Sequence, residues 1–154
     1  MNFEHGKRMT PTGRARLIAD EGLRLKVYDD KTGEPIDGLP SGGVPTIGIG
    51  RNLAGRGLTE AEAYQLFDND LASMNADILR MMPWVRTLAD ARSDVVEMVE
   101  FNTGNVFGFR KMLTALCSAD WEGAAAQLLD SEAARAAPAR YERMAAAVRS
   151  GTWD

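Results

Sequence analysis

Residues 59–82 contain neither glycine nor proline, and this uninterrupted stretch constrains the fold more than any other feature of the sequence. It opens with Thr59 and Glu62, which have the spacing of a capping box at the start of a helix. At a rise of about 1.5 Å per residue, a helix of this length spans roughly 36 Å. The sequence therefore predicts one long helix that is able to connect two lobes.

The residues before this helix have the pattern of a small sheet. Residues 23–28 alternate between apolar and polar side chains, as in a half-buried strand, and TIGIG at residues 46–50 is typical of another strand. Between them, residues 29–45 carry three prolines, several glycines and short polar residues, which predicts a long loop or hairpin tip. A helix from about Thr10 to Gly22 is expected to precede the sheet.

The sequence after the long helix is helical throughout. Glycine, aspartate and proline separate four further stretches with a helical pattern, at residues 88–102, 109–117, 121–134 and 140–149. Short connections between such helices favour a helical bundle. We therefore expect an α+β fold in one domain, residues 1–154, with lobes at about 12–60 and 84–154 and a connecting helix at about 59–82.

Composition argues against several classes of protein. Charged residues make up 26% of the chain with a net charge of -4, and the two signs are interspersed, so nothing favours binding to nucleic acid. No apolar stretch approaches the length of a membrane span, and the first 22 residues lack the apolar run of a signal peptide. We expect no membrane insertion and a soluble product made in the cytoplasm.

Neither a metal nor a cofactor is expected. Cys117 is the only cysteine and His5 the only histidine, and neither has neighbours at the spacing of a ligand cluster. Cys117 is therefore expected to be a reduced, buried thiol.

Two carboxylates near the N-terminus have the arrangement that a glycosidase needs. Cutting a link between sugars usually takes one carboxyl group that donates a proton to the leaving oxygen and one that is ionised and activates water or stabilises positive charge. Glu21 stands at the end of the first expected helix, Asp30 follows nine positions later, and Thr46 opens the glycine-rich strand. Glu21 could instead pair with a neighbouring arginine on the surface. Asp29 could also be the working carboxylate, whereas it would be a solvated neighbour if Asp30 has that role.

The strings EGLRLKVY and TIGIG, with an aspartate nine positions after the glutamate, resemble the T4-type bacteriophage lysozymes of glycoside hydrolase family 24. LTEAEAYQLFDND, the FN at residues 101–102 and the closing RSGTWD are similar to further segments of that family, so the likeness covers nearly the whole chain from about residue 12. The resemblance implies a lysozyme-like α+β fold with a small N-terminal sheet lobe, a helical C-terminal lobe and a cleft for peptidoglycan between them. It also implies hydrolysis of the β-1,4 bond from N-acetylmuramic acid to N-acetylglucosamine without a cofactor.

The resemblance further implies roles for single residues. Glu21 matches the family's proton donor, Asp30 its second carboxylate, and Thr46 the threonine that holds the catalytic water. The residues expected to bind substrate are Phe101, Gly50 and Arg51.

Two departures from the family pattern lead to predictions of their own. About ten residues are inserted between Asp30 and Thr46, and we expect the segment 31–45 to form a flap at the cleft edge that narrows the preferred glycan or contacts a partner. Arg51 stands where these relatives commonly carry histidine, and we predict that it pairs with Asp70 of the long helix.

The sequence is thus interpreted as an endolysin, a monomeric muramidase that acts on peptidoglycan glycan strands. It is expected to wait in the host cytoplasm until a separate membrane pore releases it to the cell wall. Two alternatives stay open: a catalytically weak binding protein with a lysozyme fold, and a wall-degrading module carried in the virion.

Overall fold

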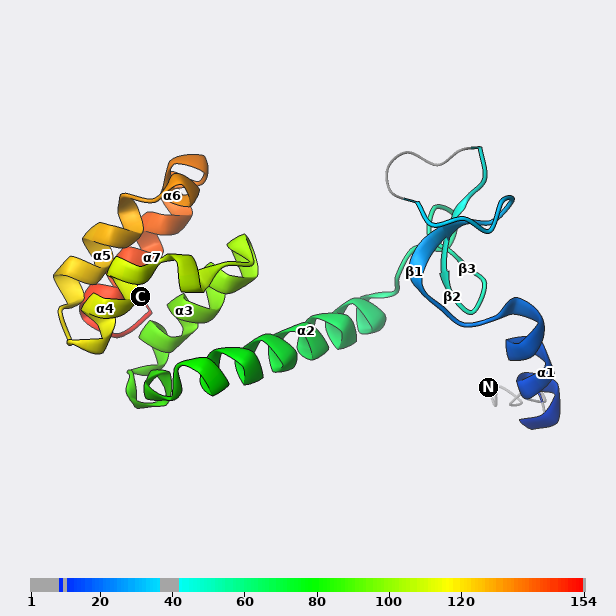
Figure 1. Ribbon diagram of the computed structural model, residues 1–154, viewed down its shortest axis with the longest axis horizontal. Coiled ribbons are helices and arrows are strands. Elements are labelled where there is room, and N and C mark those ends of the chain that lie inside the picture. The colour runs from blue at the N-terminus through cyan, green and yellow to red at the C-terminus, as the bar shows by residue number, and fades with distance from the viewer. Residues whose placement is uncertain (1–8, 10, 37–41, 154) are drawn as a thin grey trace, which may run out of the picture. The chain divides into compact units, whose positions relative to one another are not determined.

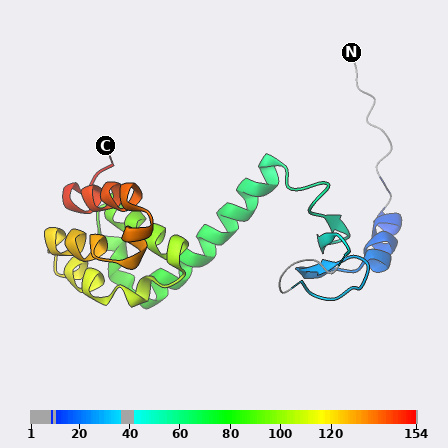
Figure 2. The ribbon, with the colours of Figure 1, turned by 90° about the horizontal axis from the view of Figure 1, so that it is seen from above.

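The computed structural model describes residues 9, 11–36 and 42–153. The chain divides into two compact units, Met1–Ala63 and Tyr64–Asp154, and each is described by itself (Figures 1 and 2). Helices and a small antiparallel sheet occur together, which confirms the expected α+β class. The organisation as a single domain stays a prediction. None of the helices in the described ranges has the length and apolar character needed to span a membrane.

The N-terminal unit contains a helix followed by a three-stranded antiparallel sheet (Figure 1). The elements are α1 (Pro11–Glu21), β1 (Arg24–Asp29), β2 (Pro45–Gly48) and β3 (Arg51–Asn52), with the sheet order β1-β2-β3. Proline suits the first turn of α1 because its φ is already helical. Gly22 ends the helix with a φ of +73° and donates its N–H to the Ile18 carbonyl oxygen at 2.9 Å.

Strand pairing brings together the two ends of the inserted segment. Tyr28 lies opposite Thr46 and Asp29 opposite Pro45, so that β1 ends beside the start of β2. The first part of the insertion folds back onto β1, because the N–H of Ile36 donates to the Val27 carbonyl oxygen at 3.1 Å. Residues 37–41 lie outside the described residues, and the flap predicted for this segment stays a prediction.

The C-terminal unit is helical. Its elements are α2 (Glu60–Met81), the 3-10 helix η1 (Pro83–Thr87), α3 (Asp90–Thr103), the 3-10 helix η2 (Val106–Gly108), α4 (Arg110–Cys117), α5 (Trp121–Leu129), α6 (Glu132–Ala136) and α7 (Pro138–Ser150). The long helix is confirmed almost to the residue. Its first turn belongs to the N-terminal unit and the remainder to the C-terminal unit.

One helix predicted from the sequence is two helices in the structure. Residues 121–134 form α5 and α6, separated by Asp130 and Ser131. The Ser131 hydroxyl oxygen accepts the N–H of Ala134 at 3.0 Å and caps the start of α6. The prediction of one helix was wrong because apolar side chains continue at helical spacing across this break, whereas the serine cap starts a new helix.

The core of the C-terminal unit is built from aliphatic and methionine side chains of several helices together with Tyr141. Fully buried members are Val95, Val96 and Val99 of α3, Leu116 of α4, Leu128 of α5, and Met144 and Val148 of α7. Cys117 is exposed, so the expectation of a buried thiol is wrong. On α4 the buried face holds Met112 and Leu116, four residues apart, and the next residue points about 100° away from that face.

Candidate active site

The side chain of Glu21 lies at the C-terminal end of α1 with its carboxylate against the backbone of Gly50. A Cβ atom placed on Gly50 would lie 2.5 Å from Glu21 Oε2 and 3.1 Å from its Cδ, too close for any real side chain. Gly50 also has a φ of +64°, a conformation that favours glycine. The last glycine of TIGIG therefore leaves room for the carboxylate of the predicted proton donor.

The surface ion pair considered for Glu21 is not formed within residues 11–36 and 42–153. Arg24, the neighbour in β1, instead stacks on the Tyr28 ring, with its Cζ 4.5 Å from the ring centroid, and donates to the Gly33 carbonyl oxygen. Glu21 is exposed, so its carboxyl group is accessible to a ligand.

Asp30 and Thr46 meet at the peptide groups of Val44. The N–H of Val44 donates to Asp30 Oδ1 at 2.7 Å, and the Thr46 hydroxyl donates to the Val44 carbonyl oxygen at 3.0 Å. The same carbonyl oxygen accepts the N–H of Asp30 at 3.2 Å. Asp30 is exposed, whereas Thr46 is only 4% exposed. One residue of the insertion thus fixes both a predicted catalytic carboxylate and a predicted catalytic hydroxyl.

Asp29 is buried, and the prediction that it is a solvated neighbour is wrong. It is 1% exposed, and its Oδ1 accepts the N–H groups of Lys31 at 2.9 Å and Thr32 at 3.2 Å. Its Oδ2 accepts the N–H of Gly43 at 2.9 Å. Sequence reasoning missed this because these three donors are backbone N–H groups of the insertion, which have no recognisable pattern in the sequence. Asp30, and not Asp29, presents its carboxylate to solvent.

Arg51 pairs with Glu62, which takes the place that we predicted for Asp70. Nη1 and Nη2 donate to the two carboxylate oxygens of Glu62 at 2.6 and 2.7 Å, and Nε donates to the Gly57 carbonyl oxygen at 2.7 Å. Such a two-point contact is the strong geometry for a guanidinium and a carboxylate. The pairing predicted with Asp70 was wrong because β3 is followed closely by the first turn of α2, where Glu62 stands. A substrate-binding role for Arg51 stays a prediction.

Glu62 also closes the capping box expected at the start of α2. Its Oε2 accepts the N–H and the hydroxyl of Thr59, both at 2.8 Å, and its own N–H donates to the Thr59 hydroxyl oxygen at 3.3 Å. The backbone N–H of Thr59, followed by the Arg51 guanidinium and the Thr59 hydroxyl, lowers the pKa of Glu62 to about 2. A single carboxylate therefore joins β3 to the first turn of α2.

Phe101 lies on α3 in the C-terminal unit and is 53% exposed. Its ring meets the ring of Phe67 edge to face, with centroids 5.6 Å apart and planes at 79°. Both rings line an apolar groove of about 430 Å³, together with Leu71, Asp94, Glu97, Met98, Asn102, Arg140 and Trp153. The ring predicted to meet a sugar is thus accessible in this unit, and its role in binding stays a prediction.

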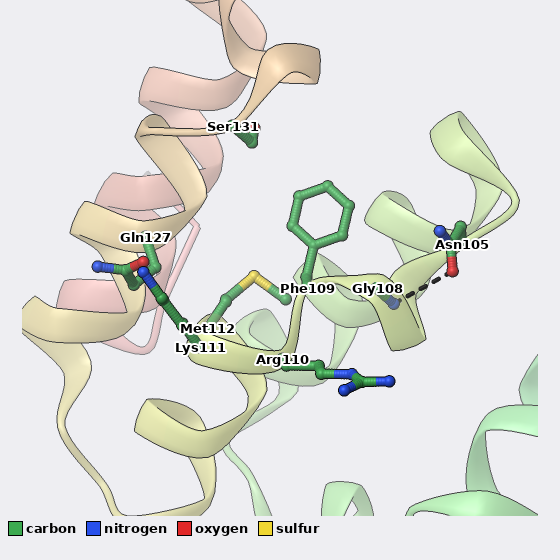
Figure 3. Close-up of a pocket in the computed structure, with 8 residues that line it drawn as sticks. All are labelled: Asn105, Gly108, Phe109, Arg110, Lys111, Met112, Gln127 and Ser131. Atoms are coloured by element: carbon green, nitrogen blue, oxygen red, sulfur yellow. Dashed lines mark hydrogen bonds between the residues drawn. The ribbon is translucent and has the colours of Figure 1, made fainter.

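Figure 3 shows a second groove of the C-terminal unit, with a volume of about 440 Å³. It is lined by Asn105, Gly108, Phe109, Arg110, Lys111, Met112, Gln127 and Ser131. The Asn105 side chain accepts the N–H of Gly108 at 3.1 Å and shapes the turn before α4. No carboxylate lines this groove, so it has no candidate for acid catalysis.

The predicted catalytic residues Glu21, Asp30 and Thr46 all belong to the N-terminal unit. An accessible carboxyl group at a helix end, a second carboxylate fixed by the N–H of Val44, and a hydroxyl that donates to the carbonyl oxygen of the same residue are suited to acid and base catalysis with water as the nucleophile. Across the described ranges, no three or more histidine, cysteine, aspartate or glutamate side chains gather in a way that could hold a metal ion.

Comparison with known proteins defines the class. Residues 19–143 match the family model for phage lysozyme, and the chain belongs to the phage lysozyme family. This confirms the resemblance found in the sequence, and membership of the family supports a muramidase-like function that degrades peptidoglycan.

One protein with a similar sequence is the pre-baseplate central spike protein Gp5 of Enterobacteria phage T4. The two sequences are 35% identical over 128 residues, and the match covers 70% of this chain but 22% of the spike protein. The chain therefore spans only a minor part of the length of that relative.

Proposed function

We propose that the chain hydrolyses the β-1,4 bond from N-acetylmuramic acid to N-acetylglucosamine in bacterial peptidoglycan. Glu21 is the general acid, Asp30 activates water or stabilises the developing positive charge, and Thr46 positions the water. The observation that carries this proposal is the shared anchoring of Asp30 and Thr46 on Val44, in the same unit as the accessible carboxyl group of Glu21.

Glu21 is suited to the acid role because its carboxyl group is exposed and has no ion-pair partner within the described ranges. A cation held against the carboxylate would oppose its protonation, which the reaction needs before the proton passes to the bridging oxygen. Gly50 contributes by leaving the space that the carboxyl group occupies.

Asp30 and Thr46 are suited to hold a water molecule between them. Asp30 Oδ1 is engaged by the Val44 N–H, which leaves Oδ2 as an acceptor. The Thr46 hydroxyl uses its hydrogen on the Val44 carbonyl oxygen, which leaves its lone pairs as acceptors. A water that donates one hydrogen to each acceptor directs a lone pair at the anomeric carbon, and the carboxylate can take the proton released on attack.

Substrate binding is assigned to Phe101, Gly50 and Arg51. The exposed ring of Phe101 offers an apolar face to a sugar ring. Gly50 keeps the backbone beside Glu21 free of a side chain, and Arg51 fixes that backbone through its contacts with Glu62 and Gly57. The substrate is the glycan strand of peptidoglycan, and the chain acts on it as a monomer.

In the biological setting that we propose, the protein is an endolysin that stays in the host cytoplasm until a separate membrane pore releases it to the wall. A second candidate is a wall-degrading module of the virion, which the likeness to a baseplate spike protein favours. Immunodetection in purified particles separates the two. Presence in particles supports the virion module, and absence from particles with accumulation in infected cells supports the endolysin.

The test of the proposed reaction is Glu21→Gln, which keeps size and shape but removes the transferable proton. The expected loss of wall-clearing activity is about 10²-fold to 10⁴-fold, the usual contribution of a general acid. Asp20→Asn is the matched control, because Asp20 is the exposed neighbour on the same helix, and it should retain activity. Glu21→Gln that clears a wall suspension at the wild-type rate would contradict the assignment. A folded wild-type chain that binds walls without cutting them would favour the alternative of a lysozyme-fold binding protein.

A further inference from the structure

We infer that Asp29 is a positioning residue for this reaction. It clamps the two ends of the inserted segment so that Val44 is held against both Asp30 and Thr46. The inference rests on the proposed roles of Asp30 and Thr46, and it gives Asp29 a positioning role that neither the family resemblance nor the spacing of the sequence assigns to it.

The insertion makes the position of Val44 relative to Asp30 depend on contacts within the loop. Asp30 and Thr46 are separated by a loop long enough to sample many conformations, so the position of Val44 relative to Asp30 has to be fixed by specific contacts. Besides the contacts of Asp29, three hydrogen bonds between described residues join the loop's ends outside the paired strands. Lys31 Nζ donates to the Gly42 carbonyl oxygen at 2.7 Å, Val44 donates to Asp30 Oδ1, and the N–H of Asp30 donates to the Val44 carbonyl oxygen at 3.2 Å. Each involves an exposed residue, Lys31 or Asp30, where water competes for the hydrogen-bonding groups, so each contributes little rigidity on its own.

Asp29 is buried, and its carboxylate joins the two ends of the loop. Its Oδ1 holds the turn that starts the insertion through the N–H groups of Lys31 and Thr32, and its Oδ2 holds the end of the insertion through the N–H of Gly43. Hydrogen bonds from N–H groups to an ionised carboxylate are about twice as strong as those between neutral groups. Both side-chain oxygens of Asp29 accept hydrogen bonds, so the site needs a carboxylate. An asparagine at this position would have only one acceptor oxygen, and its NH₂ group would face an N–H donor.

Gly43 has no side chain, which allows its backbone to approach the Asp29 carboxylate closely. A Cβ atom on Gly43 would lie 1.8 Å from Asp29 Oδ1 and 2.6 Å from Asp30 Oδ1. No side chain can therefore stand at this position while both carboxylates keep their places. The close approach puts the Gly43 N–H on Asp29 and, one residue later, the Val44 N–H on Asp30.

Asp29 is 1% exposed, so it does not touch the substrate and acts through Val44. Weakening the clamp, which consists of the hydrogen bonds of Asp29 with the N–H groups of Lys31, Thr32 and Gly43, should leave glycan binding almost unchanged. The residues assigned to glycan binding are others. Weakening the clamp should lower the rate of the chemical step, because an error of about 1 Å in the placement of a reacting group can cost about 10²-fold.

The experiment compares Asp29→Asn with Glu34→Gln, an exposed carboxylate in the same segment whose side chain forms no hydrogen bond within the described ranges. Steady-state kinetics on a soluble peptidoglycan oligomer give kcat and KM, and amide hydrogen exchange reports on Gly43 and Val44 independently of activity. For Asp29→Asn we expect kcat to fall by about 10-fold to 100-fold, KM to change by less than about twofold, and both amides to exchange faster. Glu34→Gln should match the wild type in all three.

Gly43→Ala perturbs the same contacts by another route, because its Cβ would lie 1.8 Å from Asp29 Oδ1 and 2.6 Å from Asp30 Oδ1. It should lower kcat and speed the exchange of the Val44 amide. The inference is overturned if Asp29→Asn keeps the wild-type kcat or if protection of Gly43 and Val44 survives the substitution. A wild-type chain that does not cut the glycan would overturn the proposed function instead, and the exchange data would still decide whether the clamp exists.

Discussion

Gly50→Ala tests whether the glycine of the TIGIG segment makes room for the catalytic carboxyl group. The new Cβ would lie 2.5 Å from Glu21 Oε2, whereas ordinary contact distances are about 3.5 Å. The carboxyl group must therefore retreat by about 1 Å. The backbone contributes a separate cost of about 1–2 kcal/mol, because Gly50 has a φ of +64° and alanine avoids that conformation.

Gly48→Ala is the matched control. Gly48 has nearly the same backbone conformation, with a φ of +69°, but a Cβ placed there meets no atom within 4 Å. The two substitutions therefore carry similar backbone strain, and only the one at Gly50 displaces Glu21. The comparison separates loss of stability from loss of catalytic geometry.

Urea unfolding and kcat/KM on purified wall measure the two effects. Both variants should lose about 1–2 kcal/mol of unfolding free energy. Only Gly50→Ala should lose about 10²-fold in kcat/KM, which equals roughly 2.7 kcal/mol of transition-state stabilisation. Equal losses of kcat/KM in the two variants would refute the idea that Gly50 is required by the Glu21 carboxyl group.

Three further predictions concern stability. The pKa of Glu62 is lowered to about 2, so its ionised form stabilises the folded state above the ordinary carboxyl range and this stabilisation is lost as the pH falls towards 2. The difference in urea midpoint between wild type and Glu62→Gln should accordingly be largest near neutrality and shrink in acid, and a difference independent of pH would contradict the linkage to Arg51 and Thr59. The buried hydroxyl of Tyr141 has no hydrogen-bond partner within the described ranges, so Tyr141→Phe should raise the unfolding free energy by about 1 kcal/mol, and a clear loss in chemical denaturation would show that a partner exists. Leu128 is fully buried, and Leu128→Ala should cost about 2–5 kcal/mol in thermal or chemical unfolding, whereas a cost well below that range would place this side chain outside the core.

The features that sequence reasoning predicted depend on local signals. The long helix follows from the lack of glycine and proline between the capping pair at Thr59 and the end of α2, and the strands follow from alternation and from the glycines of TIGIG. The catalytic roles of Glu21, Asp30 and Thr46 come from the family resemblance and stay predictions. The structure adds the close approach of Glu21 to Gly50 and the hydrogen bonds of Asp30 and Thr46 to Val44.

The features that sequence reasoning missed depend on contacts without a fixed spacing. The sequence predicted a solvated Asp29 because the backbone N–H groups of Lys31, Thr32 and Gly43 reach it only in the folded insertion. Glu62 was recognised as a capping residue, but its second partner, Arg51, comes from a strand whose distance from the helix cannot be read from the sequence. The break between α5 and α6 depends on one serine, which outweighs a continuous apolar pattern.

The most direct test of the proposed function is mass spectrometry of purified peptidoglycan after incubation with the wild-type chain and with Glu21→Gln. Hydrolysis by the acid and water mechanism predicts new reducing ends on N-acetylmuramic acid with the wild type and none above background with the variant. Anhydro ends, the absence of any new ends with the folded wild type, or equal amounts of product from both proteins would contradict the roles assigned to Glu21, Asp30 and Thr46.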